Sequence, residues 1–349
     1  MLEVRNLCKK YEGKPLLNGV DLTVDGGETL CLIGSSGSGK STLLRIIAGI
    51  ESADSGSVCW QGEDLRTVPG YKRNFGLMFQ DYALFPHLTV AENVAFGLRM
   101  RHLQRDEIEQ KVQSALQRVN MTSFYDRRVT DLSGGEQQRI ALARTLAPEP
   151  RLMMFDEPLA ALDRNLRFEL QEELKGMLHE TGIPTIYVTH DQEEAAFLGD
   201  HLALLHEGRI VQYGSPEEVF QYPSSRWVAE FLGFHGFIEG VVCDLSPLAV
   251  KTALGVLHPQ AAPGSEQPSL GDTVTLLIRP RKILLKGEGI GQDQIEGEVI
   301  DNRFLGNFYR VEFRLCTGAS LEFMSPTPYS IREKVILPLA EEDMLILSQ

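Results

Sequence analysis

The sequence predicts an α/β domain with a largely parallel sheet, followed by a smaller all-β domain. Short apolar runs next to polar loops and helical patterns recur up to residue 234, which is typical of parallel strands covered by helices. Beyond residue 235, short strand patterns are separated by glycine, proline and charged turns. With 43% hydrophobic residues among 349, the chain is long enough for two domains, expected at residues 1–234 and 235–349.

A glycine-rich loop, GSSGSGKST, lies between the apolar run ETLCLI and the helical pattern LLRIIAGI. Its glycines permit backbone conformations in which successive N–H groups converge on one anion at a helix N-terminus. The spacing G-x-x-x-x-G-K-[ST] adds a lysine for the β- and γ-phosphates and a hydroxyl for Mg²⁺. A flexible surface turn is the alternative, but the flanking strand and helix favour a nucleotide site. The predicted site residues are Gly34, Ser35, Ser36, Gly37, Ser38, Gly39, Lys40, Ser41 and Thr42.

Two carboxylates end a second apolar run, RLMMFDEP, whose unbroken hydrophobicity is typical of a strand buried on both faces. Asp156 would lie at the carboxyl end of this strand and hold Mg²⁺ through water. Glu157 would point elsewhere and polarise the attacking water. Many strands end in a solvated acidic turn, so the pair indicates catalysis chiefly in combination with the glycine-rich loop.

A third apolar run, PTIYVTHD, brings His190 to the same edge of the predicted sheet. Its imidazole would donate a hydrogen bond to the γ-phosphate, although an isolated histidine is more often structural. Since the preceding residues are apolar and β-branched, the pattern favours the functional role.

The region between the first two motifs is more helical, and RDEIEQKVQSALQRV places one apolar stripe toward the core. It leads into DLSGGEQQRIALARTLA, where Ser133 can cap a helix while Gly134 and Gly135 expose amide groups at its start. This arrangement predicts a second anion site, with an ordinary capped helix as the alternative.

Four motifs in this order, GSSGSGKST, LSGGE, MMFDEP and VTHD, resemble the ATP-binding cassette ATPases. The LSGGE signature is the most specific of them, because a phosphate loop alone occurs in many NTPases. The resemblance covers the whole chain and implies an α/β P-loop NTPase cassette with a mixed sheet, whose helical subdomain spans about 81–150. It also implies ATP and Mg²⁺ as ligands and an active ATPase.

The resemblance further implies a homodimer in which two copies sandwich two ATP molecules. Ser133 and Gly135 of one copy would then touch the γ-phosphate bound by the other. By the same comparison Tyr11 would stack on adenine, Gln80 would sense Mg²⁺ and the attacking water, and Asp163 would link the two sites. A half-exposed strand aromatic and a simple turn residue are the alternatives for Tyr11 and Gln80.

The sequence departs from the family pattern at two positions. Glu136 replaces the commoner glutamine of the signature, and we expect it to lie beyond the phosphate-touching residues and to leave binding intact. Ala160 stands where many members have serine, so no side-chain hydroxyl is available there to assist hydrolysis.

The branch of the family is indicated by two further segments. Residues 81–98, DYALFPHLTVAENVAFGL, resemble the segment of bacterial importers that docks a cytoplasmic helix of the permease, although its aromatics would also suit a helical core. In the C-terminal region, IEGVVCD recurs as IEGEVID, and LGDTVTLLIRPRKILL echoes IREKVILPLAEEDMLI. These repeats fit two barrels of the oligonucleotide/oligosaccharide-binding shape and resemble the regulatory barrels (TOBE domain) of importer ATPases. Ligand sensing and dimerisation are equally compatible with them.

We therefore expect the ATPase subunit of a binding-protein-dependent importer. Its partners would be two permease subunits and an extracytoplasmic solute-binding protein, at the cytoplasmic face of the cell membrane. The resemblance favours ferric iron as the solute, then polyamine, with sulfate, molybdate or sugar as further alternatives. A non-transport cassette ATPase is the rival class, which a single cassette without sustained heptads disfavours. A net charge of −14 argues against nucleic acid as a partner.

Overall fold

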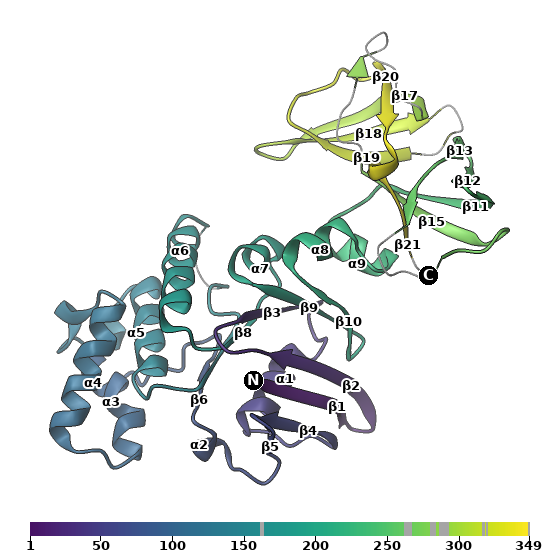
Figure 1. Ribbon diagram of the computed structural model, residues 1–349. Helices are drawn as coiled ribbons and strands as arrows, with labels where there is room; N and C mark the ends of the chain where they lie inside the picture. The colour runs from purple at the N-terminus through teal and green to yellow at the C-terminus, as the bar shows by residue number, and fades with distance from the viewer. Residues whose placement is uncertain are drawn as a thin grey trace. The chain divides into compact units, whose positions relative to one another are not determined.

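The computed structural model describes residues 1–160, 164–261, 267–279, 284–285, 293–315, 318 and 320–347. The chain forms two compact units, Met1–Pro216 and Glu217–Gln349 (Figure 1). The second unit thus begins before residue 235, where the sequence composition changes. The reason is an apolar cluster in which Ala229 and Tyr222, from the segment before 235, pack with Leu277 and Leu345 of the β-rich region. This segment contains two short helices, α8 (Pro216–Gln221) and α9 (Arg226–Phe231).

The first unit is organised around a six-stranded sheet of order β10-β9-β3-β8-β7-β6. Strands β9, β3, β8, β7 and β6 pair in parallel, and only β10 is antiparallel to its neighbour. Every residue of β3, β7 and β8 is buried, as their unbroken apolar sequences predict. The strands are β3 (Thr29–Ile33), β6 (Phe75–Met78), β7 (Leu152–Asp156), β8 (Thr185–Val188), β9 (His201–His206) and β10 (Arg209–Gly214). Because parallel strands end at the same edge, the loops that follow β3, β7 and β8 converge there.

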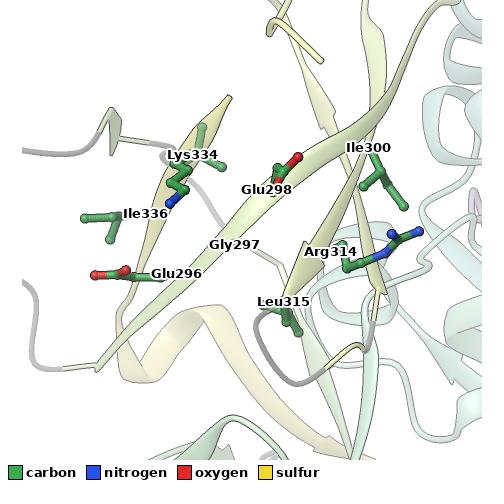
Figure 2. A pocket seen from close by; sticks show the side chains of 9 residues that line it. Glu296, Gly297, Glu298, Ile300, Arg314, Leu315, Lys334 and Ile336 are labelled. Carbon is green, nitrogen blue, oxygen red and sulfur yellow. The ribbon is translucent and has the colours of Figure 1, made fainter. Parts of the chain in front are cut away.

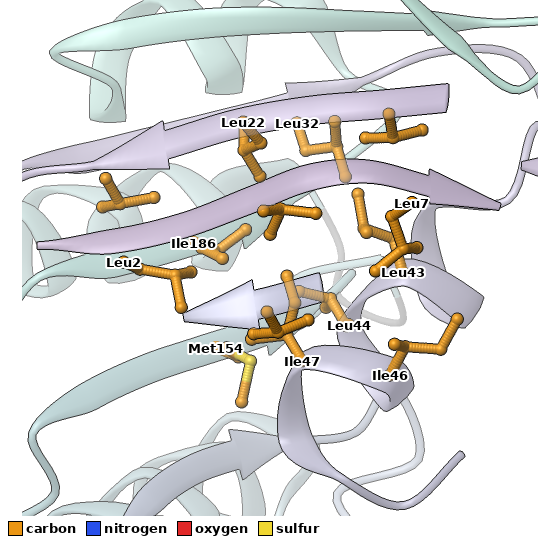
Figure 3. Close-up of a cluster of buried hydrophobic side chains, with 14 of the residues drawn as sticks. Leu2, Leu7, Leu22, Leu32, Leu43, Leu44, Ile46, Ile47, Met154 and Ile186 are labelled. Carbon is orange, nitrogen blue, oxygen red and sulfur yellow. The ribbon is translucent and has the colours of Figure 1, made fainter. Parts of the chain in front are cut away.

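A smaller antiparallel sheet lies beside the parallel one and has the order β2-β1-β4-β5. Its strands are β1 (Leu2–Tyr11), β2 (Lys14–Val24), β4 (Ser55–Trp60) and β5 (Glu63–Asp64). Helix α1 (Lys40–Ala48) packs with both sheets, since Leu44 and Ile47 share one buried cluster with Leu2 of β1 and Met154 of β7 (Figure 3). This packing fixes the helix that follows the glycine-rich loop. A one-turn helix, α2 (Gly70–Arg73), comes between β5 and β6.

Three helices form a separate group beside the β6 edge of the parallel sheet (Figure 1). They are α3 (Val90–Met100), α4 (Arg105–Arg118) and α5 (Gly134–Leu146), with 3-10 turns at Thr122–Phe124 and Val129–Asp131. The predicted apolar stripe of α4 is confirmed, because Val112, Ala115 and Leu116 are buried. The remaining helices of this unit are α6 (Arg164–Thr181), which connects β7 to β8, and α7 (Gln192–Leu198), which follows β8.

The second unit contains two mainly antiparallel sheets, of orders β13-β12-β11-β15-β21-β14 and β16-β20-β17-β18-β19. The strands of the first are β11 (Phe237–Leu245), β12 (Leu248–Thr252), β13 (Gly255–Leu257), β14 (Gln260–Ala261), β15 (Thr273–Ile278) and β21 (Met344–Leu347). Those of the second are β16 (Leu284–Leu285), β17 (Asp293–Phe304), β18 (Tyr309–Leu315), β19 (Ser320–Ser325) and β20 (Lys334–Leu339), and a 3-10 turn (Glu341–Asp343) precedes β21.

The sequence repeat coincides with a structural repeat. The motif IEGVVCD lies in β11 and IEGEVID in β17, and each strand carries a register shift at the same place in the motif, between Val242 and Asp244 and between Val299 and Asp301. The repeats are also interlocked. Strand β16 follows β15 in the chain but pairs with β20, whereas β21 follows β20 but pairs with β15. The last strand of each repeat therefore completes the sheet of the other.

Candidate nucleotide site

The glycine-rich loop occupies the turn from β3 into α1, and two of its glycines are required by close packing. A Cβ atom at Gly34 would lie 2.2 Å from the carbonyl oxygen of Leu205. Gly39, the residue before the helix, has φ 106° and would place a Cβ atom 2.7 Å from Leu17. Any larger residue at these two positions would displace neighbouring atoms, so the loop path depends on glycine.

Hydrogen-bond donors in this loop suit a phosphate group. Helix α1 has no side-chain cap and no acidic residue in its first turn, so its first three N–H groups have no carbonyl partner within the helix. The hydroxyl of Ser38 is buried and finds no hydrogen-bond partner among the described residues. Buried polar groups normally have a partner, and an anion at a helix N-terminus would provide one here.

The ammonium of Lys40 lies over the same loop. Its Nζ atom donates hydrogen bonds to the carbonyl oxygens of Gly34 at 2.8 Å and Ser35 at 3.1 Å. Burial lowers the pKa of Lys40, and the nearby carboxylates of Glu157 and Asp156 oppose that shift. A buried cation beside unpartnered amides favours a polyanionic ligand.

An oxygen pair suited to Mg²⁺ joins the loop to β7. Ser41 Oγ donates a hydrogen bond of 2.8 Å to Asp156 Oδ1. Burial raises the pKa of Asp156, while the hydrogen bond from Ser41 lowers it. No group of three or more His, Cys, Asp or Glu side chains in the described part of the chain would hold a metal ion. Two protein oxygens fit Mg²⁺ nevertheless, because this ion commonly takes one or two protein ligands and completes its shell with water and substrate phosphates.

The structure brings Glu157 and His190 together at the carboxyl ends of β7 and β8. Glu157 has φ 48°, and its N–H donates to the carbonyl oxygen of Val188 at 3.0 Å. Its Oε2 atom lies 3.1 Å from Nδ1 of His190. Since an ionised carboxylate only accepts hydrogen bonds, Nδ1 carries the proton of this contact. The sequence predicted a common edge for both residues, and the geometry adds a direct bond between them.

Gln80 is exposed and lies just after β6, the strand that pairs with β7 in the sheet. The residues that follow Gln80 are held in place by hydrogen bonds. Tyr82 and Ala83 both have positive φ, at 59° and 45°. The buried Tyr82 hydroxyl donates to the carbonyl oxygen of Pro158 at 3.2 Å. Arg144 of α5 donates to the carbonyl oxygens of Tyr82 and Ala83 at 2.5 and 2.6 Å. Tyr82 therefore connects this loop to the residue after Glu157, a role that the sequence did not reveal.

The signature segment LSGGE forms the start of α5, and two of its residues are hydrogen-bonded to each other. Both the hydroxyl and the N–H of Ser133 donate to Glu136 Oε2 at 2.7 Å. The Glu136 N–H in turn donates to Ser133 Oγ, with 3.4 Å between the nitrogen and the oxygen, and this bond completes a capping box. Glu136 thus contacts Ser133 directly, a contact that the sequence analysis did not predict. The reason is its position at N3 of the helix, from which a carboxylate reaches back to the N-cap.

The other residues implied by the family resemblance lie apart from this cluster or outside the described residues. Tyr11, at the end of β1, is 44% exposed, and its hydroxyl donates to Glu51. The Lys9 ammonium lies 5.3 Å from its ring centroid. Gly134 is exposed, whereas Gly135 is buried in α5. Asp163 lies outside the described residues.

Three features lie together at this edge of the sheet: a phosphate loop, an oxygen pair suited to Mg²⁺ and a carboxylate–histidine pair. Together they define a P-loop nucleotide hydrolase. Residues 17–160 match the ABC transporter family. The chain is 41% identical over 321 residues to the putrescine transport ATP-binding protein PotG of Escherichia coli (strain K12), covering 91% of this chain and 85% of PotG. It is 40% identical over 348 residues to the spermidine/putrescine import ATP-binding protein PotA of Mesoplasma florum, covering 99% and 97%. The chain therefore belongs to the ABC transporter ATP-binding proteins, and it is an ATPase.

Solved structures agree with this assignment. The structure of cbiO1 from Clostridium perfringens, part of the ABC transporter complex cbiONQ, matches with a TM-score of 0.59 and 32% identity over 63% of this chain and 90% of cbiO1. The dimeric structure of the bacterial ABC transporter cassette MJ0796 matches with a TM-score of 0.56 and 30% identity over 62% and 99%. Both sequence relatives are named for the transport of putrescine or of spermidine and putrescine, and neither is named for ferric iron.

A separate cavity of about 270 Å³ lies in the second unit, on β17, β18 and β20 (Figure 2). Its lining combines two acidic, two basic and several apolar residues: Glu296, Glu298, Arg314, Lys334, Ile300, Leu315, Val335 and Ile336, with Gly297. None of the predicted nucleotide-site residues that the structure describes contributes to it. Among the described residues no helix is long and apolar enough to cross a membrane.

Proposed function

We propose that this chain is the ATP-hydrolysing subunit of a polyamine importer. One observation carries the proposal: the match to PotA of Mesoplasma florum extends over 99% of the chain, so it includes the β-rich second unit as well as the cassette. The phosphate loop, the Ser41–Asp156 pair and the Glu157–His190 pair supply the chemistry of ATP hydrolysis.

In the proposed reaction the N–H groups of residues 37–42 and the Lys40 ammonium bind the phosphates. Ser41 would hold Mg²⁺, Asp156 would hold it through water, and Gln80 would sense it; the ion would neutralise charge on the phosphate oxygens. Glu157 orients the attacking water and accepts its proton. Since Nδ1 of His190 donates to Glu157, donation from Nε2 to the γ-phosphate requires the imidazolium form.

A homodimer would complete the site. The dimeric state of the related cassette MJ0796 supports this part of the proposal. Ser133 and Gly135 would contact the γ-phosphate held by the other copy, Tyr11 would stack on adenine, and Asp163 would link the two sites. Two permease subunits would hold the dimer at the cytoplasmic face of the membrane, and an extracytoplasmic binding protein would supply the solute. The barrels of the second unit would sense a ligand or strengthen the dimer.

Reconstitution of the subunit with its permeases in lipid vesicles tests the proposal. ATP hydrolysis should increase when the binding protein is loaded with putrescine or spermidine and should stay at its basal rate with ferric iron. Stimulation by ferric iron alone would assign a different solute. Co-purification with ribosomes instead of permeases would favour a non-transport cassette ATPase.

A further inference from the structure

A buried carboxylate lies behind the turn that carries His190. Glu194, in the first turn of α7, is only 5% exposed. Its two carboxylate oxygens accept hydrogen bonds from different hydroxyls, Oε1 from Tyr187 and Oε2 from Thr189. Tyr187 and Thr189 both precede His190, on β8 and just after it. One buried side chain thus holds the strand end that leads into the catalytic histidine.

The other side of His190 is fixed by the same group of residues. The N–H of Asp191 donates to Thr189 Oγ1 at 3.0 Å, so the hydroxyl of Thr189 bridges Glu194 and Asp191. Asp191 Oδ1 in turn accepts from the Glu194 N–H at 3.1 Å and caps α7. Both neighbours of His190 are therefore bound to each other and to Glu194. The imidazole itself is the exposed part of this turn, since 62% of its side chain is accessible to solvent.

The network also reaches the strand that carries Asp156 and Glu157. Tyr187 is fully buried, and its ring lies 5.7 Å from that of Phe155 between centroids. In the sheet, Phe155 pairs with Tyr187 and Asp156 with Val188. A carboxylate with one hydroxyl donor on each oxygen forms stronger hydrogen bonds than a neutral acceptor would. Such a network has a single favoured arrangement, because an unsatisfied member in the interior is costly.

We propose that Glu194 is a positioning residue for hydrolysis: its carboxylate fixes the Thr189–Asp191 turn so that His190 stays within hydrogen-bond distance of Glu157. The inference rests on the proposed catalytic roles of His190 and Glu157. It predicts that replacing Glu194 lowers turnover only when His190 is present. A residue that only stabilises the fold would act independently of His190.

A double-mutant cycle separates these two cases. Glu194→Gln keeps the size of the side chain but turns one acceptor into a donor. In the dimeric full chain we expect about a tenfold fall in kcat, with KM for ATP changed less than about twofold. In a His190→Ala background the same substitution should change the residual single-turnover rate less than about twofold. An equal tenfold loss in both backgrounds, or an unchanged kcat in the Glu194→Gln variant, would overturn the proposal.

Two further variants keep the test decisive. Glu193→Gln changes the adjacent, exposed carboxylate and should leave kcat and KM as in the wild type. If Glu194→Gln does not fold, Thr189→Val removes the bridging hydroxyl and should give the same non-additive loss with His190→Ala. A His190→Ala variant with wild-type turnover would instead contradict the proposed function of His190, and the positioning role would fall with it.

Discussion

The starts of α1 and α5 are both flanked by glycine and both predict an anion site, yet they differ in the structure. At α1 no side chain caps the helix, and the buried Ser38 hydroxyl has no partner among the described residues. At α5 the donors of Ser133 are bound by Glu136 of the same chain. At α1 the donors are available to a ligand, whereas at α5 those of Ser133 are already bound. A phosphate bound by Ser133 at α5 would therefore compete with a carboxylate, so we expect α1 to be the primary site.

The largest effect is expected from adding a methyl group inside the glycine-rich loop that precedes α1. In Gly34→Ala the new methyl group would overlap the Leu205 carbonyl oxygen, so the free energy of unfolding should fall by about 3 kcal/mol, as measured by urea titration. Gly26→Ala is the matched control, because no atom of the described residues, apart from Gly26 and its chain neighbours, would lie within 4 Å of its new Cβ. Equal stabilities of the two variants would show that the loop does not pack as described.

Removing the buried cation should weaken binding at α1 without a similar loss of stability. We expect Lys40→Ala to lower the affinity for ATP about 100-fold, because a charge-assisted contact to phosphate is lost. Isothermal titration calorimetry measures the change, with the exposed Lys72→Ala as the control. ATP affinity that is unchanged in Lys40→Ala would remove this lysine from the site.

The closed helix start can be compared with a second capping box in the same chain, formed by Thr89 and Glu92 at α3. Ser133→Ala and Thr89→Ala should each lower the free energy of unfolding by about 1 kcal/mol, since each loses an N-cap. Only Ser133→Ala should also reduce ATP turnover by the proposed dimer. A similar loss of turnover in Thr89→Ala would show that capping alone, rather than phosphate contact, explains the effect.

The smallest effect concerns the charge of Glu136. Hydrogen bonds from Ser133 hold the pKa of Glu136 below its ordinary value. Its stabilisation is therefore complete above the unfolded-state pKa and is lost as pH falls through the folded-state pKa. The stability difference between wild type and Glu136→Gln should shrink between pH 7 and about pH 3, and modestly, because solvent screens the carboxylate. Urea titrations that give a pH-independent difference would contradict this.

The contrast also shows what the sequence could predict. The glycines of the phosphate loop, Asp156 and His190 follow from local patterns, because spacing along a strand or loop fixes where these residues lie. Glu194 and Arg144 could not be found in this way, since their partners are hydroxyl and carbonyl groups brought close only by the folded sheet. The positive φ of Tyr82 has no marker in its side chain. Similarly, the repeats are visible in the sequence. The alternation of side chains along a strand does not reveal its pairing partner, however, so the exchange of β16 and β21 between the two sheets could not be predicted.

We expect the loop before α1 to bind the triphosphate of ATP. A crystal structure of the chain with Mg²⁺ and a non-hydrolysable ATP analogue tests it most directly. We predict phosphate oxygens within hydrogen-bond distance of Lys40 Nζ and of N–H groups in residues 37–42, with the metal ion between Ser41 and Asp156. An analogue whose phosphates lie elsewhere, with the Ser38 hydroxyl still unpartnered, would contradict the account.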